Sequence, residues 1–177
     1  MKRYILTGAP GSGKTTIIRL LEADGYPVIH EAATDVIADA QKEGNPEPWR
    51  QVDFIDHIAR KQAHRQRQTC MGDVQFYDRS PICTYALSRY LNFPMTELLQ
   101  TELDYIQRNP IYQREVFFIA NLGFCEKTAA RRISFEDALV FEKIHYEVYR
   151  ALGYECIEVA PQPADERVGF ILRHVLG

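Results

Sequence analysis

Residues 8–15 have the residue types and spacing of a phosphate-binding loop. The segment reads Gly-Ala-Pro-Gly-Ser-Gly-Lys-Thr and fits the pattern G-x-x-x-x-G-K-[ST] at every position. Its glycines let backbone N–H groups turn toward phosphate oxygens, and the N-terminus of the following helix adds unpaired N–H groups and a dipole. We therefore expect this segment, called the phosphate loop below, to bind a nucleoside triphosphate.

The phosphate loop also supplies two side chains with separate expected roles. Lys14 brings a flexible positive charge to the β- and γ-phosphates of ATP, and the Thr15 hydroxyl reaches the Mg²⁺ ion that bridges them. Thr16 is a candidate for one more phosphate contact. The full set expected to bind the nucleotide is Gly8, Pro10, Gly11, Ser12, Gly13, Lys14, Thr15 and Thr16. A glycine-rich turn without a ligand is the competing interpretation.

Two charged residues follow the apolar run of residues 74–77. A carboxylate at Asp78 can hold the magnesium shell through water, so Asp78 joins Thr15 as a candidate metal ligand. Arg79 can stabilise charge on a phosphoryl group during its transfer. The alternative is that Asp78 and Arg79 form a surface pair that opens the next helix.

Glu31 follows the apolar run that ends near His30. As a general base it could accept the proton of an attacking hydroxyl, provided that it lies within hydrogen-bond reach of the acceptor. The alternative is a helix N-terminal glutamate that only interacts with the helix dipole.

Residues 121–133 lie between an expected strand and a long helix and are a plausible lid. Closure of such a lid would exclude water and bring Arg131 or Arg132 onto the phosphates, which favours transfer to a bound alcohol over hydrolysis. Both arginines could equally be ordinary solvated side chains.

An α/β fold is needed to bring these candidates together. Short apolar runs typical of strands alternate with longer stretches of helical periodicity, which predicts a parallel sheet covered by helices on both faces. Polar groups at the ends of the first three runs would then meet at one edge, where ligands bind in open α/β sheets. The expected strands are residues 3–7, 26–30, 74–78, 115–120 and 154–160.

Helix boundaries are marked in several places. Gly25 and Gly153 are expected stop signals, while Ser80 and Ser134 are expected N-terminal caps. Residues 44–48 should break one helix, and another should start at Trp49 with Val52, Ile55, Ala59 and Ala63 on one side. We expect its end, residues 64–68, to be a solvated face. His145 falls within an apolar helical stripe, which favours a satisfied core histidine over a ligand.

Size and composition favour one globular domain over residues 1–177. The net charge is -3, so there is no overall positive field to gather nucleic acid. No apolar run approaches the roughly 20 residues that span a bilayer, and a cytoplasmic location is expected. The oligomeric state, monomer or homodimer, is open.

The four cysteines have no metal-site or dithiol spacing and are expected to be reduced thiols: Cys70, Cys83, Cys125 and Cys156.

Several of these segments together resemble one known family. The phosphate loop with Thr16, the glutamate after the second strand, residues 77–80 and residues 131–159 are similar to the small P-loop family that contains the ribosylnicotinamide kinase domain of NadR-type proteins. That family is commonly described as AAA-type ATPase domains. The Asp-Arg-Ser sequence of residues 78–80 also resembles the Glu-Arg-Ser segment of deoxyribonucleoside kinases.

The resemblance implies a fold, and with the residues above it suggests a function. The implied fold is a three-layer P-loop NTPase fold whose five parallel strands lie in the order 2-3-1-4-5, with ATP and Mg²⁺ as ligands. Our leading hypothesis is a small-molecule kinase that phosphorylates a hydroxyl of a nucleoside or ribosyl compound. A regulatory ATPase or GTPase-like binding module is the alternative, although no N-K-x-D guanine-reading segment is present. A scaffold without turnover is the third hypothesis.

Overall fold

Five parallel strands form one sheet at the centre of the protein. The computed structural model describes residues 1–68, 72–122 and 134–177. The strand order is β2-β3-β1-β4-β5, as the family resemblance implied. Pairing of Leu6 with Asp78 and of Thr7 with Phe118 sets the register at the carboxyl end of the central strand. The strands are β1 Lys2–Thr7, β2 Val28–Ile29, β3 Val74–Asp78, β4 Glu115–Ile119 and β5 Glu155–Val159.

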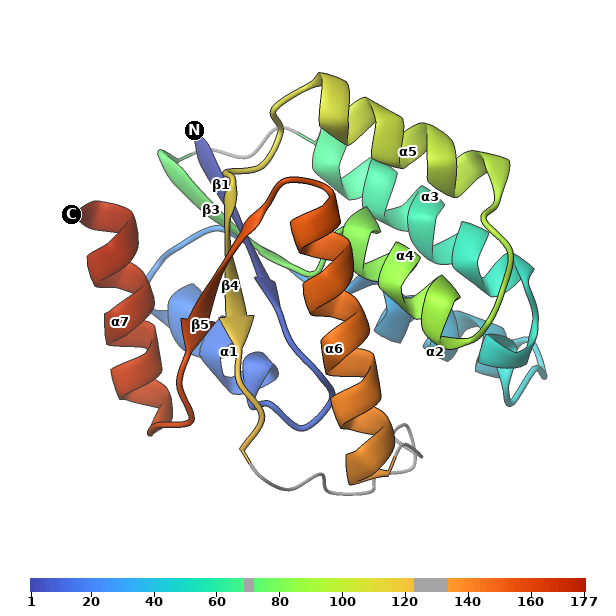
Figure 1. Cartoon of the computed structure of the whole chain (residues 1–177), viewed down its shortest axis with the longest axis horizontal. Helices are drawn as coiled ribbons and strands as arrows, with labels where there is room; N and C mark the ends of the chain where they lie inside the picture. The colour runs from blue at the N-terminus through green and yellow to red at the C-terminus, as the bar shows by residue number, and fades with distance from the viewer. Residues whose placement is uncertain (69–71, 123–133) are drawn as a thin grey trace.

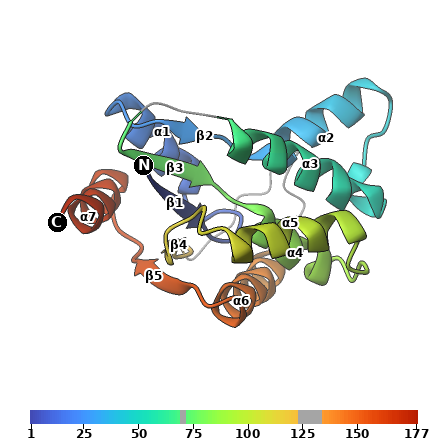
Figure 2. The same cartoon turned by 90° about the horizontal axis from the view of Figure 1, so that it is seen from above.

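Helices cover both faces of this sheet, giving three layers (Figures 1 and 2). One face packs against α1 and α7, and the other against α3, α4, α5 and α6. Alternation along β3 divides the two cores, because Phe76 belongs to the first and Tyr77 to the second. The helices are α1 Lys14–Ala23, α2 Ala32–Lys42, α3 Asp53–Arg67, α4 Pro81–Tyr90, α5 Glu97–Arg108, α6 Phe135–Ala151 and α7 Ala164–Leu176, with a 3₁₀ turn η1 at Pro48–Arg50.

The expected helix boundaries are confirmed at both kinds of signal. Gly25 and Gly153 have φ values of 87° and 81°, in the left-handed region that ends a helix. The Ser80 Oγ accepts a hydrogen bond from the N–H of Ile82, and the Ser134 Oγ accepts one from Asp137. These two caps fix the starts of α4 and α6, the helices that flank the carboxyl end of β3.

The expectation for α3 was wrong at both ends. The regular helix begins at Asp53 after the 3₁₀ turn, and Val52 is exposed. Residues 64–68 are not simply a solvated face, because Gln66 is buried and donates from Nε2 to Glu102 on α5 over 3.0 Å. Arg67 also donates to Glu102, over 2.8 Å. The end of α3 is therefore part of the packing between α3 and α5.

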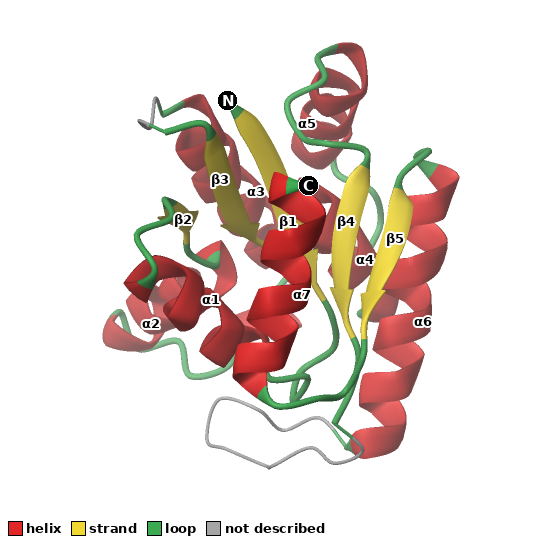
Figure 3. Cartoon of the chain, turned by 90° about the vertical axis from the view of Figure 1, so that its left-hand side faces the viewer, coloured by secondary structure: helices red, strands yellow, loops and turns green. Residues whose placement is uncertain are grey.

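All the long strands point the same way, so their carboxyl ends meet at one edge (Figure 3). At this edge β1 passes through the phosphate loop into α1, and β3 passes through Arg79 into α4. Cys83 and Cys156 are free thiols, whereas Cys70 and Cys125 lie outside the described residues. In the part of the chain that the structure describes, no helix is long and apolar enough to cross a membrane.

Candidate active site

The phosphate loop leaves β1 at Gly8 and enters α1 at Lys14. Gly8 has φ 147°, and a Cβ there would lie 2.5 Å from the carbonyl oxygen of Ile119. Only glycine fits, because the neighbouring atom belongs to the backbone of β4 and cannot move aside. The close approach of β1 and β4 therefore dictates the first glycine of the motif.

Arg167 on α7 holds the phosphate loop from behind. Its Nη1 donates to the carbonyl oxygen of Ser12 over 2.7 Å, and its Nη2 donates to Ala120 over 2.7 Å and to Val159 over 3.3 Å. Arg167 is 2 % exposed, and this burial lowers its pKa. One guanidinium thus joins the loop to the ends of β4 and β5. Arg167 was not among the residues predicted from the sequence, although its i, i+4, i+8 spacing with Ile171 and Val175 places a charge on an apolar helix face.

Lys14 and Asp78 form a buried ion pair. The Lys14 Nζ contacts the Asp78 Oδ1, and the two side chains are 6 % and 7 % exposed. The alternative interpretation, in which Asp78 and Arg79 form a surface pair, is therefore wrong. The two residues are brought together because β1 and β3 are neighbours in the sheet and both end at this edge.

Arg79 turns away from Asp78 and pairs with Glu31. The Arg79 Nε lies 2.6 Å from the Glu31 Oε1, and the Thr34 hydroxyl donates to the Glu31 Oε2 over 3.2 Å. Glu31 is the residue before α2, but its side chain makes no capping hydrogen bond within the described residues. Its carboxylate faces the guanidinium instead, so the dipole-only interpretation does not describe this arrangement.

Two opposing effects set the pKa of Glu31. Burial alone would raise this pKa, but the positive charges of Arg79 and Lys14 and the hydrogen bond from Thr34 outweigh it and lower the pKa to about 2. For Arg79, burial alone would lower the pKa, and Glu31 raises it above its ordinary value. Both groups are therefore charged at neutral pH.

The backbone of Arg79 is unusual for a residue with a side chain. Its φ is 71°, in the left-handed region, and its N–H donates to the carbonyl oxygen of Leu6 over 3.1 Å. This conformation costs on the order of 1–3 kcal/mol for such a residue. The cost is offset by the contacts that the turn makes, with β1 on one side and the cap of α4 on the other.

A buried polar chain connects the end of β1 to α4 and α6. The Tyr149 hydroxyl lies 2.9 Å from the Ser80 Oγ and 3.0 Å from the Cys83 Sγ. The Thr7 Oγ1 lies 3.3 Å from the same sulfur. Burial raises the pKa of Tyr149 well above 10, so its hydroxyl stays protonated. The chain ties the last residue of β1 to the first turn of α4.

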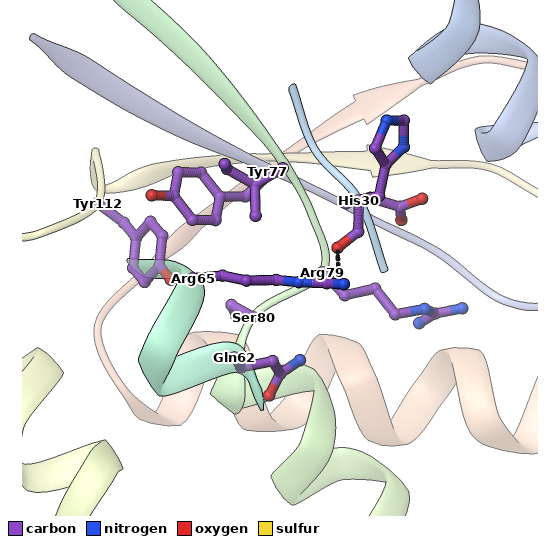
Figure 4. A pocket seen from close by; sticks show the side chains of 9 residues that line it. His30, Gln62, Arg65, Tyr77, Arg79, Ser80 and Tyr112 are labelled. Carbon is purple, nitrogen blue, oxygen red and sulfur yellow. Dashed lines mark hydrogen bonds between the residues drawn. The ribbon is translucent and has the colours of Figure 1, made fainter. Parts of the chain in front are cut away.

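A small cavity lies beside the Asp78–Arg79 turn. Its volume is about 10 Å³, roughly what one water molecule needs. Figure 4 shows Arg65 extended across it from α3, with its guanidinium at the backbone oxygen of His30, to which Nη1 donates over 2.7 Å. Arg65 also pairs with Asp35 on α2. The cavity walls come from β2 and the residue after it, β3 and the turn after it, α3 and the segment before β4: Ile29, His30, Gln62, Arg65, Tyr77, Asp78, Arg79, Ser80 and Tyr112.

The residues at this edge fit a bound triphosphate and Mg²⁺. Within the described residues, the backbone N–H groups of Gly13, Lys14 and Thr15 donate to no backbone carbonyl. The side chains of Thr15 and Thr16 are exposed. No cluster of three or more His, Cys, Asp or Glu side chains in the described ranges could hold a metal by itself. Mg²⁺ is commonly held by one or two protein oxygens together with substrate phosphates, which Thr15 and Asp78 match.

The structure brings most of the candidate residues together. Lys14, Glu31, Asp78 and Arg79 form one cluster of alternating charge at the carboxyl edge of β1, β2 and β3. The expected lid falls almost entirely outside the described residues, which include only Asn121 and Leu122 of it. Arg131 and Arg132 also lie outside them.

Comparisons with known proteins agree with this fold. The family described as an AAA domain is matched by residues 3–167. A search of curated protein sequences finds no significant match. Among solved structures, deoxyadenosine kinase from M. mycoides with bound dATP is similar with a TM-score of 0.64 and 14 % identity, over 99 % of this chain and 100 % of that chain.

Two further structures of deoxyadenosine kinase from M. mycoides give nearly the same result. The structure with the products dCMP and a flexible dCDP has a TM-score of 0.63 and 15 % identity, over 98 % of both chains. The structure with bound dCTP has a TM-score of 0.62 and 14 % identity, over 99 % of both chains. At this identity the likeness establishes the fold.

Proposed function

Since this chain belongs to the family of AAA domains and carries its phosphate loop, we propose that it is an ATP- and Mg²⁺-dependent small-molecule kinase. Its acceptor would be a hydroxyl of a nucleoside or ribosyl compound. The acceptor class rests on the resemblance to NadR-type ribosylnicotinamide kinase domains and on the fold shared with a deoxyadenosine kinase. The residues proposed to act are Lys14, Glu31, Asp78 and Arg79, with Arg131 and Arg132 as further candidates.

The observation that carries this proposal is the Glu31–Arg79 pair beside Lys14. A protein that only binds a nucleotide needs the phosphate loop and a magnesium ligand, but it does not need a second carboxylate there. Glu31 supplies that carboxylate from a different strand end, 2.6 Å from a guanidinium that can meet a phosphoryl group. A base and a charge-stabilising group side by side are what transfer to a hydroxyl requires.

In the proposed reaction, Glu31 accepts the proton of the acceptor hydroxyl. The hydroxyl oxygen forms a bond to the γ-phosphorus while the bond from that phosphorus to the bridging oxygen of ADP breaks. With a pKa of about 2, Glu31 is ionised but weakly basic. Its basicity would increase as the phosphates neutralise the charges of Arg79 and Lys14. Proton transfer would thus be coupled to correct placement of the phosphoryl group.

Lys14 and Asp78 would exchange partners when the nucleotide binds. Lys14 leaves the carboxylate for the β- and γ-phosphates, and Asp78 becomes available with Thr15 to hold Mg²⁺. When bound, Mg²⁺ neutralises charge on the β- and γ-phosphates. The loss of a buried ion pair is offset by charge-assisted hydrogen bonds to phosphate, which are among the strongest that proteins make.

Acceptor binding requires the cavity beside Arg79 to open. At about 10 Å³ it has no room for a sugar ring, and Arg65 extends across it. Arg65 is held by His30 on the β2 side and by Asp35 on α2. We propose that α2 and the Arg65 side chain move apart to admit the acceptor. The closed arrangement would exclude water from the site until the acceptor is present.

The proposal is tested by acceptor-dependent ATP consumption. Purified protein with Mg²⁺–ATP is incubated with a panel of nucleosides and ribosyl compounds, and ADP and phosphorylated products are quantified by mass spectrometry. We expect one acceptor class to raise ADP formation strongly, with one monophosphate formed per ADP. Equal ADP formation with and without every acceptor, by folded protein that binds ATP, would reject the kinase in favour of a regulatory NTPase.

Two variants separate nucleotide binding from phosphoryl transfer. Glu31→Gln should keep ATP affinity and slow transfer about 100-fold or more, because a positioned general base contributes roughly 10²–10⁴-fold. Glu43→Gln is the matched control, since Glu43 is an exposed glutamate at the other end of α2, and it should transfer at the wild-type rate. Unchanged transfer in Glu31→Gln would remove Glu31 from the role of base.

A further inference from the structure

His145 is a buried histidine on the sheet-facing side of α6. Its side chain is fully buried, and it lies in the stripe with Ala138, Phe141 and Val148 that was expected from the sequence. Both ring nitrogens have partners. The Nδ1 lies 2.9 Å from the carbonyl oxygen of Phe141, and the Nε2 lies 3.3 Å from the Nη1 of Arg79. It is a satisfied core histidine, but one of its partners belongs to the candidate active site.

These two partners leave one arrangement of protons on the ring. A carbonyl oxygen can only accept, so the Nδ1 of His145 carries the hydrogen and donates it to Phe141. The guanidinium of Arg79 can only donate, so the Nε2 must present its lone pair. A neutral ring protonated at Nδ1 satisfies both contacts, whereas a doubly protonated ring would repel Arg79. Burial, followed by the charge of Arg79, lowers the pKa of His145 to about 3, in agreement with this neutral form.

Arg79 is therefore held from two opposite elements. Glu31, at the start of α2, approaches its Nε, and His145, on α6, approaches its Nη1. The left-handed backbone of Arg79 projects the side chain between them. Among the described residues no acceptor is hydrogen-bonded to its Nη2. The ion pair at Nε and the hydrogen bond at Nη1 restrict the orientation of the guanidinium and leave Nη2 for a ligand.

We propose that His145 is a positioning residue, which orients the Arg79 guanidinium toward the transferring phosphoryl group. This inference rests on the proposed function for its catalytic consequence, although the orientation itself does not. Glu31 alone is a poor support, since it must release Arg79 as the proton moves. A neutral acceptor on α6 keeps the guanidinium in place through that change. The hydrogen bond from the Arg79 Nη1 to His145 therefore has a role that the Glu31–Arg79 ion pair cannot supply.

Three substitutions at position 145 separate the two ring nitrogens. In His145→Gln the amide oxygen reaches the region of Nε2 and can accept from Arg79. In His145→Asn the amide lies near the position of Nδ1 and can donate to Phe141 but does not reach Arg79, and His145→Phe keeps ring volume with neither polar contact. We expect Gln to stay within a few-fold of wild-type kcat. Asn and Phe should lose roughly 10- to 100-fold in kcat, the scale of a small misplacement of a reacting group.

The kinetic pattern distinguishes positioning from a general loss of structure. The KM for ATP should stay within about twofold in all three variants, because the phosphate loop is untouched. If kcat follows the melting temperature instead, so that Gln falls as far as Asn, or if Phe keeps the wild-type kcat, the proposal is overturned.

A second readout does not depend on kinase activity. Nitrogen-15 NMR of wild-type protein should show His145 as the neutral form protonated at Nδ1, and slow rotation of the Arg79 guanidinium about its Cζ–Nη bonds. Rotation should stay slow in His145→Gln and become fast in His145→Asn and His145→Phe. Unchanged rotation in Phe would refute the orientation by His145. If rotation changes in this way among the variants while no acceptor is phosphorylated by wild-type protein, the orientation by His145 stands and only the proposed reaction fails.

Discussion

Lys14, Asp78, Arg79 and Glu31 are four charged side chains in one small volume, and they neutralise each other in two pairs. A buried charge is costly to desolvate unless it is paired, and removal of one partner leaves the other uncompensated. The two pairs therefore make each residue important for stability as well as for chemistry. Substitutions at this site must be interpreted with that in mind.

A double-mutant cycle can distinguish the contribution of the Lys14–Asp78 pair to stability from the contribution of Lys14 to nucleotide binding. Lys14→Met and Asp78→Leu should each destabilise the protein by about 3–5 kcal/mol, the usual cost of breaking a buried pair. The double variant should recover much of this loss, because neither charge remains. Nucleotide binding should be lost wherever Lys14 is replaced. Denaturant unfolding and calorimetry with Mg²⁺–ATP measure the two effects, and additive destabilisation in the double variant would contradict the coupling.

His145 should make the folded state sensitive to mild acid. Its pKa is about 3 when folded and about 6.5 in the unfolded chain. Between these values the unfolded chain binds a proton that the folded protein does not, so stability falls as the pH drops below 6.5. Burial is the largest cause of this lowered pKa, and the charges of Arg79 and Lys14 lower the pKa further, whereas the hydrogen bond to Phe141 and the charge of Glu31 raise it.

The measurement is the free energy of unfolding between pH 5.0 and 6.5, a range above the pKa of Glu31 both in the unfolded chain, 4.5, and in the folded protein, about 2. We expect a loss of about 1–3 kcal/mol toward the acid end in wild-type protein, and a flatter profile in His145→Gln. His57→Gln is the control, because His57 is exposed on α3, and its profile should keep the wild-type slope. A wild-type slope in His145→Gln would show that another group is responsible.

At the scale of elements, α7 contributes to the candidate site indirectly, because its residue Arg167 supports the phosphate loop through the Ser12 carbonyl oxygen. Arg167 joins the phosphate loop to the ends of β4 and β5 through three carbonyl oxygens. Without the guanidinium, the Ser12 and Ala120 oxygens would lose these hydrogen bonds, whereas the Val159 oxygen would keep the one from the Ala120 N–H. An unsatisfied buried acceptor costs roughly 1–3 kcal/mol. Loop geometry and nucleotide affinity should therefore depend on a helix at the end of the chain.

Arg167→Met tests this dependence. We expect a loss of about 2–4 kcal/mol of stability and at least a tenfold weaker affinity for Mg²⁺–ATP, because the loop amides are no longer held in place. Arg173→Met is matched to it, since Arg173 lies on the same helix but is exposed, and should change stability by less than about 0.5 kcal/mol. Wild-type nucleotide affinity in folded Arg167→Met would mean that the loop keeps its shape unaided.

The contrast between the phosphate loop and α3 explains how far the sequence could be used. The loop functions through its backbone, so its glycines and its position between a strand and a helix could be recognised locally. The end of α3 was misinterpreted because Gln66 is polar yet buried, with a hydrogen bond to Glu102 of α5, and the bounds of α5 were not predicted. Arg167 lies 155 residues from its partner Ser12, and no local pattern specifies such a contact.

The strand ends and the strand order could also be predicted from the sequence and the family resemblance. Alternating apolar runs predicted five strands, and the family resemblance supplied the order that brings Glu31, Asp78 and Lys14 to one edge. The pairing among these charges could not be predicted, because it depends on the direction of each side chain after folding. Arg79 illustrates this, since its left-handed backbone turns it from Asp78, its neighbour in sequence, toward Glu31.

At the scale of the whole molecule, we propose that residues 1–177 form one domain that includes the nucleotide site. Both cores pack on the same five-stranded sheet. Arg167 on α7 connects to Ser12 in the phosphate loop, and Tyr149 on α6 connects to Ser80 at the start of α4. Loss of either helical layer would expose the core that this layer covers, and loss of the sheet would expose both cores. Cooperative unfolding in one step is the physical consequence.

Thermal unfolding with and without nucleotide therefore tests the domain and the site together. We expect one calorimetric transition whose midpoint rises with Mg²⁺–ATP, because a ligand at 100 times its Kd stabilises the folded state by about 2.7 kcal/mol. For a chain of this size that corresponds to roughly 5–10 °C. The same nucleotide should leave the midpoint of Lys14→Met unchanged, since the charge that grips the phosphates is gone. Two separate transitions would contradict a single domain, whereas one transition that ignores every nucleoside triphosphate would contradict the phosphate site.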